Sequence, residues 1–599
     1  MRNWIEKFRQ NGLLKEIKEP VDIDQEIGIL SYIEAKKNDG KVLLFSNPTN
    51  SKGDKFDPVV TNLFANKSVL ELIFGQDVKK IADEISTLLK PEIPEGFIQK
   101  IDFFYHLSKY RSIFPKYLKT PGICQEIRQG EIDLFKLPIL KTWPNDAGQF
   151  ITMGQVYTKD FGGKTQNLGM YRLQVFDKNY LGVHWQIHKD AMSIFYKYVK
   201  IGKKMPVSVA IGGDPLYIWC AQAPLPKGIF ELLLYGFIRK EPAKLVKSLT
   251  NEIFIPHDVD FVIEGFVDPN VFKEEGPFGD HTGFYTPKEE FPVMEVSAIT
   301  SKKNPIFNAT IVGKPPVEDK FMGYATERIF LPLFKVNVPE LVDYKMPENG
   351  VFHNLILSKI KTPFPFTARQ VMHSFWGIGQ MSFVKHVIFI DENGPKLDDY
   401  LKFSEYVLNR FGVKSLIISE GICDQLDHAS PNSCFGGKLA IDASADFCEF
   451  VPQILDDDKI LKLLNSEEPK ITNAKQYFKD TKTPILLLNF KKENKVKFSF
   501  NKILNFRDYF KIVIFVDENI NLNNPYMLVW RIVNNIDAKR DIFIDKEQIC
   551  VDATAKHEWE GYEREWPKEV LCDKKIVKKL IEKNLIKEDT KFFEKFELI

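Results

Sequence analysis

Two similar copies of a nine-residue sequence occur in the last third of this chain of 599 residues. Its first copy, K-H-V-I-F-I-D-E-N, begins at Lys385, and its second, K-I-V-I-F-V-D-E-N, begins at Lys511. Helical patterns follow each copy, and then comes a second apolar run that contains an acid, Asp442 or Asp552. Apolar strands that end in acids and alternate with helices are typical of a parallel α/β sheet. The repeat therefore predicts two related α/β modules, separated by a Lys- and Asn-rich stretch near residues 455–500.

The rest of the chain divides into two parts of different texture. Residues 1 to about 110 alternate helical patterns with strand candidates such as Lys41–Phe45 and Pro58–Thr61. From about 115 to 325, short strands alternate with hairpin signals, which predicts a β-barrel or sandwich with one embedded helix. We therefore expect a multidomain α+β chain. Its expected domains are an N-terminal α/β domain (1–112), a strand-rich domain (113–325), two α/β modules (326–450 and 451–567) and a helical tail (568–599).

Composition removes several classes of function. Lys and Arg total 82 against 81 Asp and Glu, so no net charge favours nucleic acid as the main partner. The seven cysteines form no C-x-x-C pair, which suits a reducing compartment and predicts a cytoplasmic protein. The most apolar run, Gly228–Ile238, is about half the length that a bilayer requires. The amphipathic pattern of Lys574–Leu585 predicts a helix that docks on its own protein, on another subunit or on a membrane surface.

The segment E-E-G-P-F-G-D-H-T-G, residues 274–283, places two carboxylates five residues apart on a glycine-rich loop beside a histidine. Glycine and proline let such a loop run close to a ligand, so Glu275 and Asp280 can converge. Two carboxylates held close together split their titrations, which would leave one protonated at neutral pH. The segment predicts a site for proton transfer; its alternative is a surface turn with solvated acids.

An amide and a guanidinium flank a glycine in the strand-like run Q-N-L-G-M-Y-R-L-Q. In an ideal strand Asn167 and Arg172 face opposite sides, so both serve one site only if Gly169 marks a bulge or the strand end. The alternative is a strand with Arg172 at its edge. Farther along, His184, Gln186 and His188 alternate in a way that places them on one face of a strand.

Glu231 lies in an apolar helical run, where a buried carboxylate costs several kcal/mol unless a cation or a set of donors compensates it. Together with Asn167 and His188 it makes a mixed oxygen and nitrogen set, which suits manganese or magnesium better than zinc. Such a cation commonly bridges a protein carboxylate to a phosphate. The set therefore favours a phosphorylated cofactor.

These segments resemble the UbiD family of decarboxylases that use prenylated flavin mononucleotide (prenylated FMN), over residues 1 to about 445. The resemblance rests on separate motifs in the family's order: N-L-G-x-Y-R at 167–172, the histidine at 188, P-V-S-V-A-I-G-G-D-P at 206–215, Glu231, E-G-P-F-G-D-H-T-G at 275–283 and G-K-P-P-x-E-D at 313–319.

The resemblance implies a split β-barrel, similar to that of flavin reductases, around the flavin. It implies that Asn167, His188 and Glu231 bind Mn²⁺ or Mg²⁺, with K⁺ nearby. The cofactor-binding residues that it implies are Asn167, Met170, Arg172, His188, Glu231 and Lys385, of which Lys385 reaches the phosphate. The catalytic residues that it implies are Arg172, Glu275 and Asp280. Many family members have a second Glu where this chain has Asp280, which leaves the distance from acid to substrate uncertain.

In the family's chemistry, Arg172 would hold a substrate carboxylate, Glu275 would orient Arg172, and Asp280 would deliver a proton after carbon dioxide leaves. The implied substrate is a hydroxynaphthoate of menaquinone synthesis or a prenylated hydroxybenzoate of ubiquinone synthesis, with menaquinone favoured by the duplicated module. A flavin prenyltransferase of the UbiX type would supply the cofactor, and the chain would form a homo-oligomer, a dimer or a hexamer. Two alternatives are a flavin reductase-like oxidoreductase on the same barrel and a non-catalytic assembly subunit.

Overall fold

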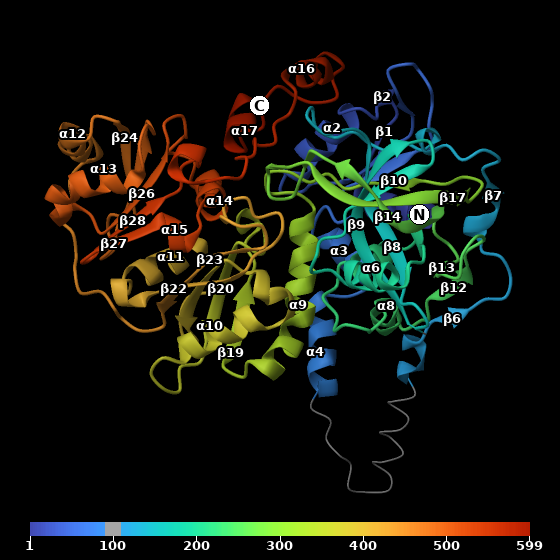
Figure 1. The fold of residues 1–599 in the computed structure, drawn as a ribbon, viewed down its shortest axis with the longest axis horizontal. Coiled ribbons are helices and arrows are strands. Elements are labelled where there is room, and N and C mark those ends of the chain that lie inside the picture. The colour runs from blue at the N-terminus through green and yellow to red at the C-terminus, as the bar shows by residue number, and fades with distance from the viewer. Residues whose placement is uncertain (90–108, 164) are drawn as a thin grey trace, which may run out of the picture. The chain divides into compact units, whose positions relative to one another are not determined.

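The structure is a computed structural model that describes residues 1–89, 109–163 and 165–599 (Figure 1). It contains two compact units. Unit 1 comprises Met1–Ile329, Glu569–Phe593 and Leu598–Ile599, and unit 2 comprises Phe330–Lys568 and Glu594–Glu597. Each unit is described by itself below. The expected N-terminal domain, 1–112, includes residues 90–108, which lie outside the described residues.

Unit 1 begins with an amphipathic helix and a small sheet. Helix α1 (Arg2–Gln10) buries Trp4 and Phe8, and the strands β1 (Leu14–Ile17), β3 (Val42–Phe45), β5 (Val59–Thr61) and β18 (Phe307–Asn308) pair in that order. The strands expected at 41–45 and 58–61 are therefore confirmed. Three helices accompany them: α2 (Glu26–Ala35), α3 (Lys67–Phe74) and α4 (Val78–Leu89).

A closed antiparallel barrel forms the centre of unit 1. Its strands pair in the order β10-β9-β8-β11-β14-β17, and β10 pairs again with β17, which closes the ring. The expected barrel is thereby confirmed, whereas its split, flavin reductase-like character stays a prediction. The strands are β8 (Phe150–Lys159), β9 (Gln166–Asp177), β10 (Tyr180–Val183), β11 (Met205–Ile211), β14 (Phe261–Glu275) and β17 (Glu289–Ser301).

Two of the barrel strands, β8 and β11, are buried on both faces. All seven residues of β11 are buried, and so are nine of the ten in β8. Strands buried on both sides read as continuous apolar runs instead of alternating patterns. The helices of this region are α6 (Asp190–Ile201), α7 (Pro215–Cys220) and α8 (Leu232–Arg239), and α6 contacts β8, β9 and β14.

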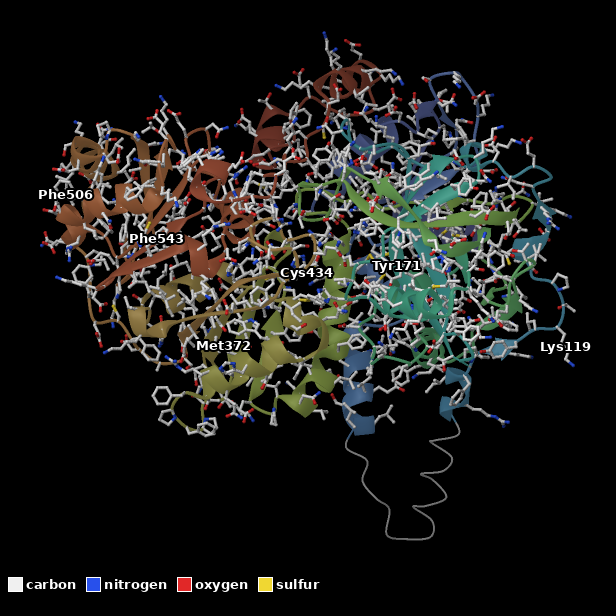
Figure 2. The ribbon with its side chains drawn as sticks, viewed as in Figure 1. Lys119, Tyr171, Met372, Cys434, Phe506 and Phe543 are labelled. Atoms are coloured by element: carbon white, nitrogen blue, oxygen red, sulfur yellow. The ribbon has the colours of Figure 1, made fainter. Side chains whose placement is uncertain are left out.

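Gly169 lies inside β9 and marks neither a bulge nor a strand end. The condition under which Asn167 and Arg172 would face one side is therefore not met, and the two residues face opposite sides of β9. The β8–β9 register is regular from Asn167 to Tyr171, and its irregularity falls on β8 between Ile151 and Gly154. A Cβ at Gly169 would lie 2.3 Å from the ring of Tyr171, which Figure 2 labels. Gly169 is therefore required because the Tyr171 ring lies against the backbone there.

Unit 2 contains two five-stranded sheets with the same topology (Figure 1). In each, three parallel strands lie at the centre and an antiparallel strand lies at each edge. The first sheet has the order β19 (Leu341–Lys345), β20 (Leu355–Ile360), β21 (His386–Asp391), β23 (Phe435–Ala443), β22 (Leu416–Ile422). The second has the order β24 (Ile471–Tyr477), β25 (Ile485–Phe490), β26 (Ile512–Asp517), β28 (Gln548–Asp552), β27 (Ile542–Asp545).

The two copies of the repeated sequence form β21 and β26, the central strands of the two sheets. The predicted parallel pairing is confirmed at the centre of each sheet, whereas the antiparallel edge strands, which make both sheets mixed, were not predicted. The stretch near 455–500 does not separate the modules either. It forms α12 (Asp457–Glu467), β24, β25 and α13 (Val496–Ile503), and so contributes two strands to the second sheet. Lysines on the exposed sides of these elements concealed their apolar core.

The basic C-terminal helix docks on unit 1 itself. Helix α16 (Lys574–Glu582) buries Val577 and Leu580, and Lys579 and Lys583 form ion pairs with Glu26 of α2 at 2.7 and 2.9 Å. Contact with its own protein is therefore the alternative that the structure supports. Across the described residues, no helix combines the length and the hydropathy needed to cross a bilayer.

Candidate active site

A buried ion-pair network joins the barrel strand β9 to the loop after β14. Arg172 donates from Nε and Nη2 to the two carboxylate oxygens of Glu275, at 2.8 and 2.9 Å. Its Nη1 donates to Asp280 at 2.5 Å. All three side chains are buried. The structure thus brings together the three residues predicted to be catalytic, in the fork geometry that makes arginine–carboxylate pairs strong.

The loop that carries Asp280 follows a path that only glycine permits at two positions. Gly276 has a φ of +94° and donates its N–H to Gln174 Oε1 of β9 at 2.8 Å. A Cβ at Gly279 would lie 2.3 Å from the indole of Trp143. The glycines of the motif therefore bend the chain and let it pass against a buried ring, as the sequence predicted.

Neutral groups complete the surroundings of the guanidinium. Thr286 Oγ1 accepts from Arg172 Nη2 at 3.1 Å, and the ring of Phe278 lies 4.7 Å from the guanidinium carbon. An aromatic face near a buried cation adds attraction without adding a charge. Thr286 and Phe278 lie in two short paired strands, β15 (Phe278–Gly279) and β16 (Tyr285–Thr286), which fold the loop back on itself.

The pKa values of both carboxylates lie below their usual range, which differs from the expected split titration. Burial raises the pKa of Glu275, but the charge of Arg172 and a hydrogen bond from His184 outweigh burial and bring the pKa to about 2. Burial also raises the pKa of Asp280, but His281 and Arg172 hold it well below its usual range. A cation between two carboxylates replaces their mutual repulsion with attraction to a shared partner.

The sequence did not predict that His184 contacts Glu275. Its Nδ1 lies 3.3 Å from Glu275 Oε2, and burial followed by the charge of Arg172 lowers its pKa. The expected alternation of His184, Gln186 and His188 on one face was wrong, because β10 ends at Val183. His184 is therefore buried at the ion pair, whereas His188 lies exposed in a turn.

Asp146 is a second residue that the sequence did not place in the site. Its Oδ1 accepts from the N–H of Gly279 at 2.8 Å, and its Oδ2 accepts from the N–H of Trp143 at 2.8 Å. It thereby ties the Asp280 loop to the segment W-P-N-D-A-G. Its position in that segment, before the first barrel strand, is the only signal that could have indicated it.

The predicted metal residue Glu231 precedes α8 and lies beside β9. It accepts from the backbone N–H of Leu168 at 2.7 Å, and burial raises its pKa to about 8. The nearby charge of Asp190 raises this pKa further. Asn167 adjoins Leu168, so it lies close to this carboxylate. Two acids near one buried position are more stable when a cation lies between them.

The polar atoms around Asn167 test whether the site fits a metal and a phosphate. Within the ranges that the structure describes, Asn167 Nδ2, Thr158 Oγ1 and Trp185 Nε1 are buried without a hydrogen-bond partner. Thr158 is paired with Asn167 in the β8–β9 ladder, and Trp185 follows β10. Buried polar atoms are nearly always hydrogen-bonded, so the unpaired atoms of Asn167 and Thr158, on neighbouring barrel strands, fit a site that a polar ligand fills.

Among the described residues, no cluster of three or more His, Cys, Asp and Glu side chains could hold a metal ion. The predicted set has one histidine and one acid, so an amide oxygen and oxygens of the ligand would have to complete it. That donor set suits Mn²⁺ or Mg²⁺, which commonly bind through few protein ligands and a phosphate. The residues present therefore fit the group that the motif implies, and the metal site stays a prediction.

Two further predicted cofactor residues have defined contacts. Met170 lies in β9 and donates its backbone N–H to Ala221 O at 2.9 Å. Lys385, in unit 2, is fully buried and pairs with Asp427 at 2.7 Å. Its counterpart in the repeat, Lys511, donates to the backbone oxygens of Phe411 and Phe450 at 3.0 and 3.1 Å. The two lysines therefore occupy equivalent places in the repeat with different partners.

Sequence models of one family match most of the chain. The 3-octaprenyl-4-hydroxybenzoate carboxy-lyase N-terminal domain matches residues 5–89, and the Rift-related domain of the same enzyme matches residues 116–315. The C-terminal domain matches two stretches, residues 320–443 and 454–561, which contain the two five-stranded sheets.

Related sequences occur in distant bacteria. An uncharacterized protein of Helicobacter pylori (strain J99) is 48% identical over 605 aligned residues, which cover 100% of this chain and 98% of the relative. An uncharacterized protein of Aquifex aeolicus (strain VF5) is 42% identical and covers 75% of this chain and 92% of its own length. The first relative therefore spans the duplicated module, whereas the second aligns with three quarters of the chain.

Solved structures share the fold. Vanillic acid decarboxylase of Sedimentibacter hydroxybenzoicus in its closed form has a TM-score of 0.64 and 23% identity, over 77% of this chain and 98% of that chain. The UbiD-class enzyme HmfF from Pelotomaculum thermopropionicum, in an evolved dimeric form in complex with prenylated FMN, has a TM-score of 0.60 and 23% identity, over 74% of this chain and 94% of that chain. The domain matches, the 42–48% identical relatives and this fold agree: the chain belongs to the UbiD family of aromatic-acid carboxy-lyases.

Proposed function

We propose that this chain decarboxylates an aromatic carboxylic acid of quinone synthesis without net oxidation, with prenylated FMN as its cofactor. The observation that carries the proposal is the buried Arg172, held between two ionised carboxylates on the barrel. A flavin reductase does not require this pair of acids, and a silent assembly subunit would not require the buried network. The network is costly to bury, and its use in proton transfer explains its presence.

The donors of Arg172 leave room for a substrate. A guanidinium has five N–H groups. Four of them point to Glu275, Asp280 and Thr286, so one N–H on Nη1 has no partner in the described part of the chain. That N–H lies beside Asp280. A substrate carboxylate bound there would lie next to the proposed proton donor, while Glu275 keeps the guanidinium in its orientation.

Asp280 must take up a proton before it can deliver one. In the structure its pKa is low, because burial is outweighed by His281 and Arg172. A substrate carboxylate that shares Arg172 would compete for its charge, and burial would then raise the pKa of Asp280. Asp280 would hold a proton in the substrate complex and transfer it from its carboxyl oxygen to the carbon from which carbon dioxide has left. Glu275, bonded twice to Arg172, would stay ionised.

The cofactor would be held by the residues that the family motifs imply. Asn167, His188 and Glu231 would bind it through Mn²⁺ or Mg²⁺ with K⁺ nearby, Met170 and Arg172 would contact it, and Lys385 would reach its phosphate. When bound, prenylated FMN supplies the electron sink that decarboxylation of an aromatic acid needs. The chain itself binds and orients the substrate, excludes water and moves the proton.

We favour a substrate of menaquinone synthesis, a dihydroxynaphthoate, over a prenylated hydroxybenzoate. The duplicated C-terminal module and the length of this chain resemble family members assigned to menaquinone synthesis. The structural neighbours are named for other acids, vanillic acid and 3,4-dihydroxybenzoic acid. The protein would act in the cytoplasm as a homo-oligomer, a dimer or a hexamer, supplied with cofactor by a flavin prenyltransferase of the UbiX type.

The test is co-expression with such a flavin prenyltransferase. The purified protein should carry a flavin whose visible spectrum and mass match prenylated FMN, and it should release carbon dioxide from one class of aromatic acid. A panel of hydroxybenzoates and hydroxynaphthoates, with and without prenyl chains, identifies the class. A protein that binds unmodified FMN and oxidises a nicotinamide cofactor would instead be a flavin reductase-like oxidoreductase. A protein without flavin would be an assembly subunit.

A further inference from the structure

The chain returns to unit 1 after the second sheet of unit 2, and it contacts the loop that carries Asp280. This returning segment, residues 569–585, is called the C-terminal strap here. It belongs to unit 1, whereas the family's domain models end at residue 561. The strap is therefore a part of this chain whose role the family match does not describe.

The first residues of the strap form a β-bridge with the Asp280 loop. Glu569 and Phe284 are bridge partners, and the N–H of Val570 donates to Gly283 O at 2.8 Å. Gly283 in turn donates to Asp280 O at 2.9 Å, and Asp280 donates its N–H to Phe284 O at 3.1 Å. The backbone of Asp280 is thus bonded to the same two residues that the strap holds.

An ion pair with a buried lysine fixes the strap at the same level. Glu569 Oε2 lies 2.6 Å from Lys314 Nζ; the Lys314 side chain is 1% exposed and the Glu569 side chain is 29% exposed. The backbone oxygen of Lys314 accepts from Lys36 Nζ at 2.7 Å and from Tyr32 Oη at 3.0 Å. Tyr32 lies in α2, and Lys36 is the residue that follows its last turn. Charge-assisted bonds of this kind are stronger than neutral ones and add geometric specificity. The strap is therefore anchored to a loop that is itself fixed on α2.

Residues farther along the strap also hold it on unit 1. Val570 and Cys572 are buried, and α16 adds Val577 and Leu580 to the core of unit 1. The ion pairs of Lys579 and Lys583 with Glu26 tie α16 to the start of α2. Burial of these apolar side chains makes the attachment stable.

The opposite end of the Asp280 loop is held independently of the strap. Gly276 donates to Gln174, Gly279 donates to Asp146, and Ala147 donates to Pro277 O at 2.9 Å. Without the strap, the residues after Asp280 would keep the pairing of β15 with β16 but would lose the backbone hydrogen bond to Gly283 O. Glycine at 283, with a φ of +85°, would then let this turn move.

We infer that the C-terminal strap is a positioning element for Asp280, which acts through the backbone of Gly283 and Phe284. The inference rests on the proposed role of Asp280 as proton donor. By fixing the residues after Asp280, the strap keeps the carboxylate within hydrogen-bond distance of Arg172 and of the bound substrate. Misplacement of a catalytic group by about 1 Å can lower the rate by on the order of 10²-fold. Glu569 and Val570 are positioning residues in this sense.

The experiment compares two variants of Val570 in the full-length holoenzyme. Val570→Pro removes the N–H that donates to Gly283, whereas Val570→Ala keeps it and loses only part of the side chain. Hydrogen–deuterium exchange of the peptide 278–286 is measured for both. We expect exchange to be about 10-fold faster in Val570→Pro than in wild type and to change little in Val570→Ala. Equal exchange in the three proteins would overturn the inference.

A thermal double-mutant cycle tests the coupling without any assay of activity. Asp280→Asn and Val570→Pro are measured alone and together, with Val570→Ala as the matched background. If the strap holds Asp280 against Arg172, the effect of Asp280→Asn on Tm is smaller in the Val570→Pro background than in wild type. If Asp280→Asn changes Tm by the same amount in the Val570→Pro background as in wild type and in Val570→Ala, the inference is contradicted.

Turnover separates positioning from general stability. For the aromatic acid that wild type decarboxylates, Val570→Pro should lower kcat about 10- to 100-fold, with KM and the flavin spectrum within about 3-fold of wild type. Val570→Ala should retain kcat within about 3-fold. If wild type decarboxylates no acid while the exchange and the cycle behave as expected, the proposed function fails and the strap's hold on Asp280 stands. An unchanged kcat in an active Val570→Pro protein would overturn the strap's role.

Discussion

Arg172 of β9 and Glu275 of β14 form a two-fold hydrogen-bonded ion pair, at 2.8 and 2.9 Å, between two barrel strands that are distant in sequence and are not paired with each other. Both side chains are buried, since Glu275 is 0% and Arg172 is 8% exposed. A pair of this kind orients the guanidinium, and it makes the protonation of Glu275 costly. It links the chemistry of the site to the stability of the barrel.

This pair predicts how the stability of the protein depends on acid. The pKa of Glu275 falls from its ordinary value of 4.5 to about 2 in the folded protein. Its contribution to stability is therefore complete above about pH 4.5 and is lost as the pH falls toward 2, because the unfolded state binds the proton first. The size of the effect is on the order of 3 kcal/mol. Glu275→Gln should melt at lower temperature at neutral pH and lose less stability between pH 5 and pH 3.

The neighbouring acid provides the control for that measurement. Glu274 is exposed and pairs with Lys288 at the surface. Exposed pairs contribute about 0–1 kcal/mol, so Glu274→Gln should follow the acid profile of wild type. Melting temperatures at several pH values check both variants. A Glu275→Gln protein with an acid profile as steep as that of wild type would show that other groups cause the loss.

Asp280→Asn should abolish turnover while the protein still binds its flavin. The amide is close in size to the carboxyl group and accepts the same hydrogen bonds from His281 through its oxygen, so the fold and the cofactor site should persist. It cannot deliver the proton. We expect kcat to fall at least about 10³-fold, which is within the range of general acid catalysis. The checks are single-turnover release of carbon dioxide and the visible spectrum of the bound flavin. Normal turnover would remove Asp280 from the reaction.

The sequence predicted which residues form the site better than it predicted their protonation and burial. The motif spacing indicated that Glu275 and Asp280 converge, and the apolar run around Glu231 indicated a buried acid. Both are observed. The ionised state of the two acids was not predictable, because it depends on Arg172, which lies on a strand about 100 residues earlier. The burial of His184 was missed because the alternation of side chains in a strand was assumed to continue to His188, whereas β10 ends at Val183.

The fold was predictable where the signal was local. The repeat indicated two modules, and both sheets place the repeated strand at their centre. The antiparallel edge strands were not predictable, because the direction in which an edge strand pairs depends on tertiary packing and not on its own sequence pattern. The hydrogen bond between Val570 and Gly283 was also not predictable. It joins residues that are hundreds of positions apart, and no local sequence pattern indicates such a contact.

Removal of the Glu231 carboxylate should abolish stabilisation by a divalent metal. The carboxyl group is buried, with a pKa of about 8, so a neutral glutamine is tolerated in its place. Saturating Mn²⁺ should raise the Tm of wild type by several degrees, because a ligand of the native state alone stabilises it. Glu231→Gln should show no shift and retain little metal after dialysis. Glu241→Gln, a change at an exposed position, is the control. A full Mn²⁺ shift in Glu231→Gln would place the metal elsewhere.

The two lysines of the repeat should differ in their effect on flavin binding. Lys385→Met leaves the buried Asp427 without its cation, and loss of one partner of a buried ion pair costs about 3–5 kcal/mol. Lys511→Met removes hydrogen bonds to two backbone oxygens and to Cys448 Sγ, and leaves no buried acid unpaired. Lys385→Met combined with Asp427→Asn removes both charges, and so should recover much of the lost stability. If Lys385 binds the cofactor phosphate, this double variant should regain its Tm and still lose flavin, whereas Lys511→Met keeps a flavin content like that of wild type. A double variant with both its Tm and its flavin restored would show that Lys385 acts only through Asp427.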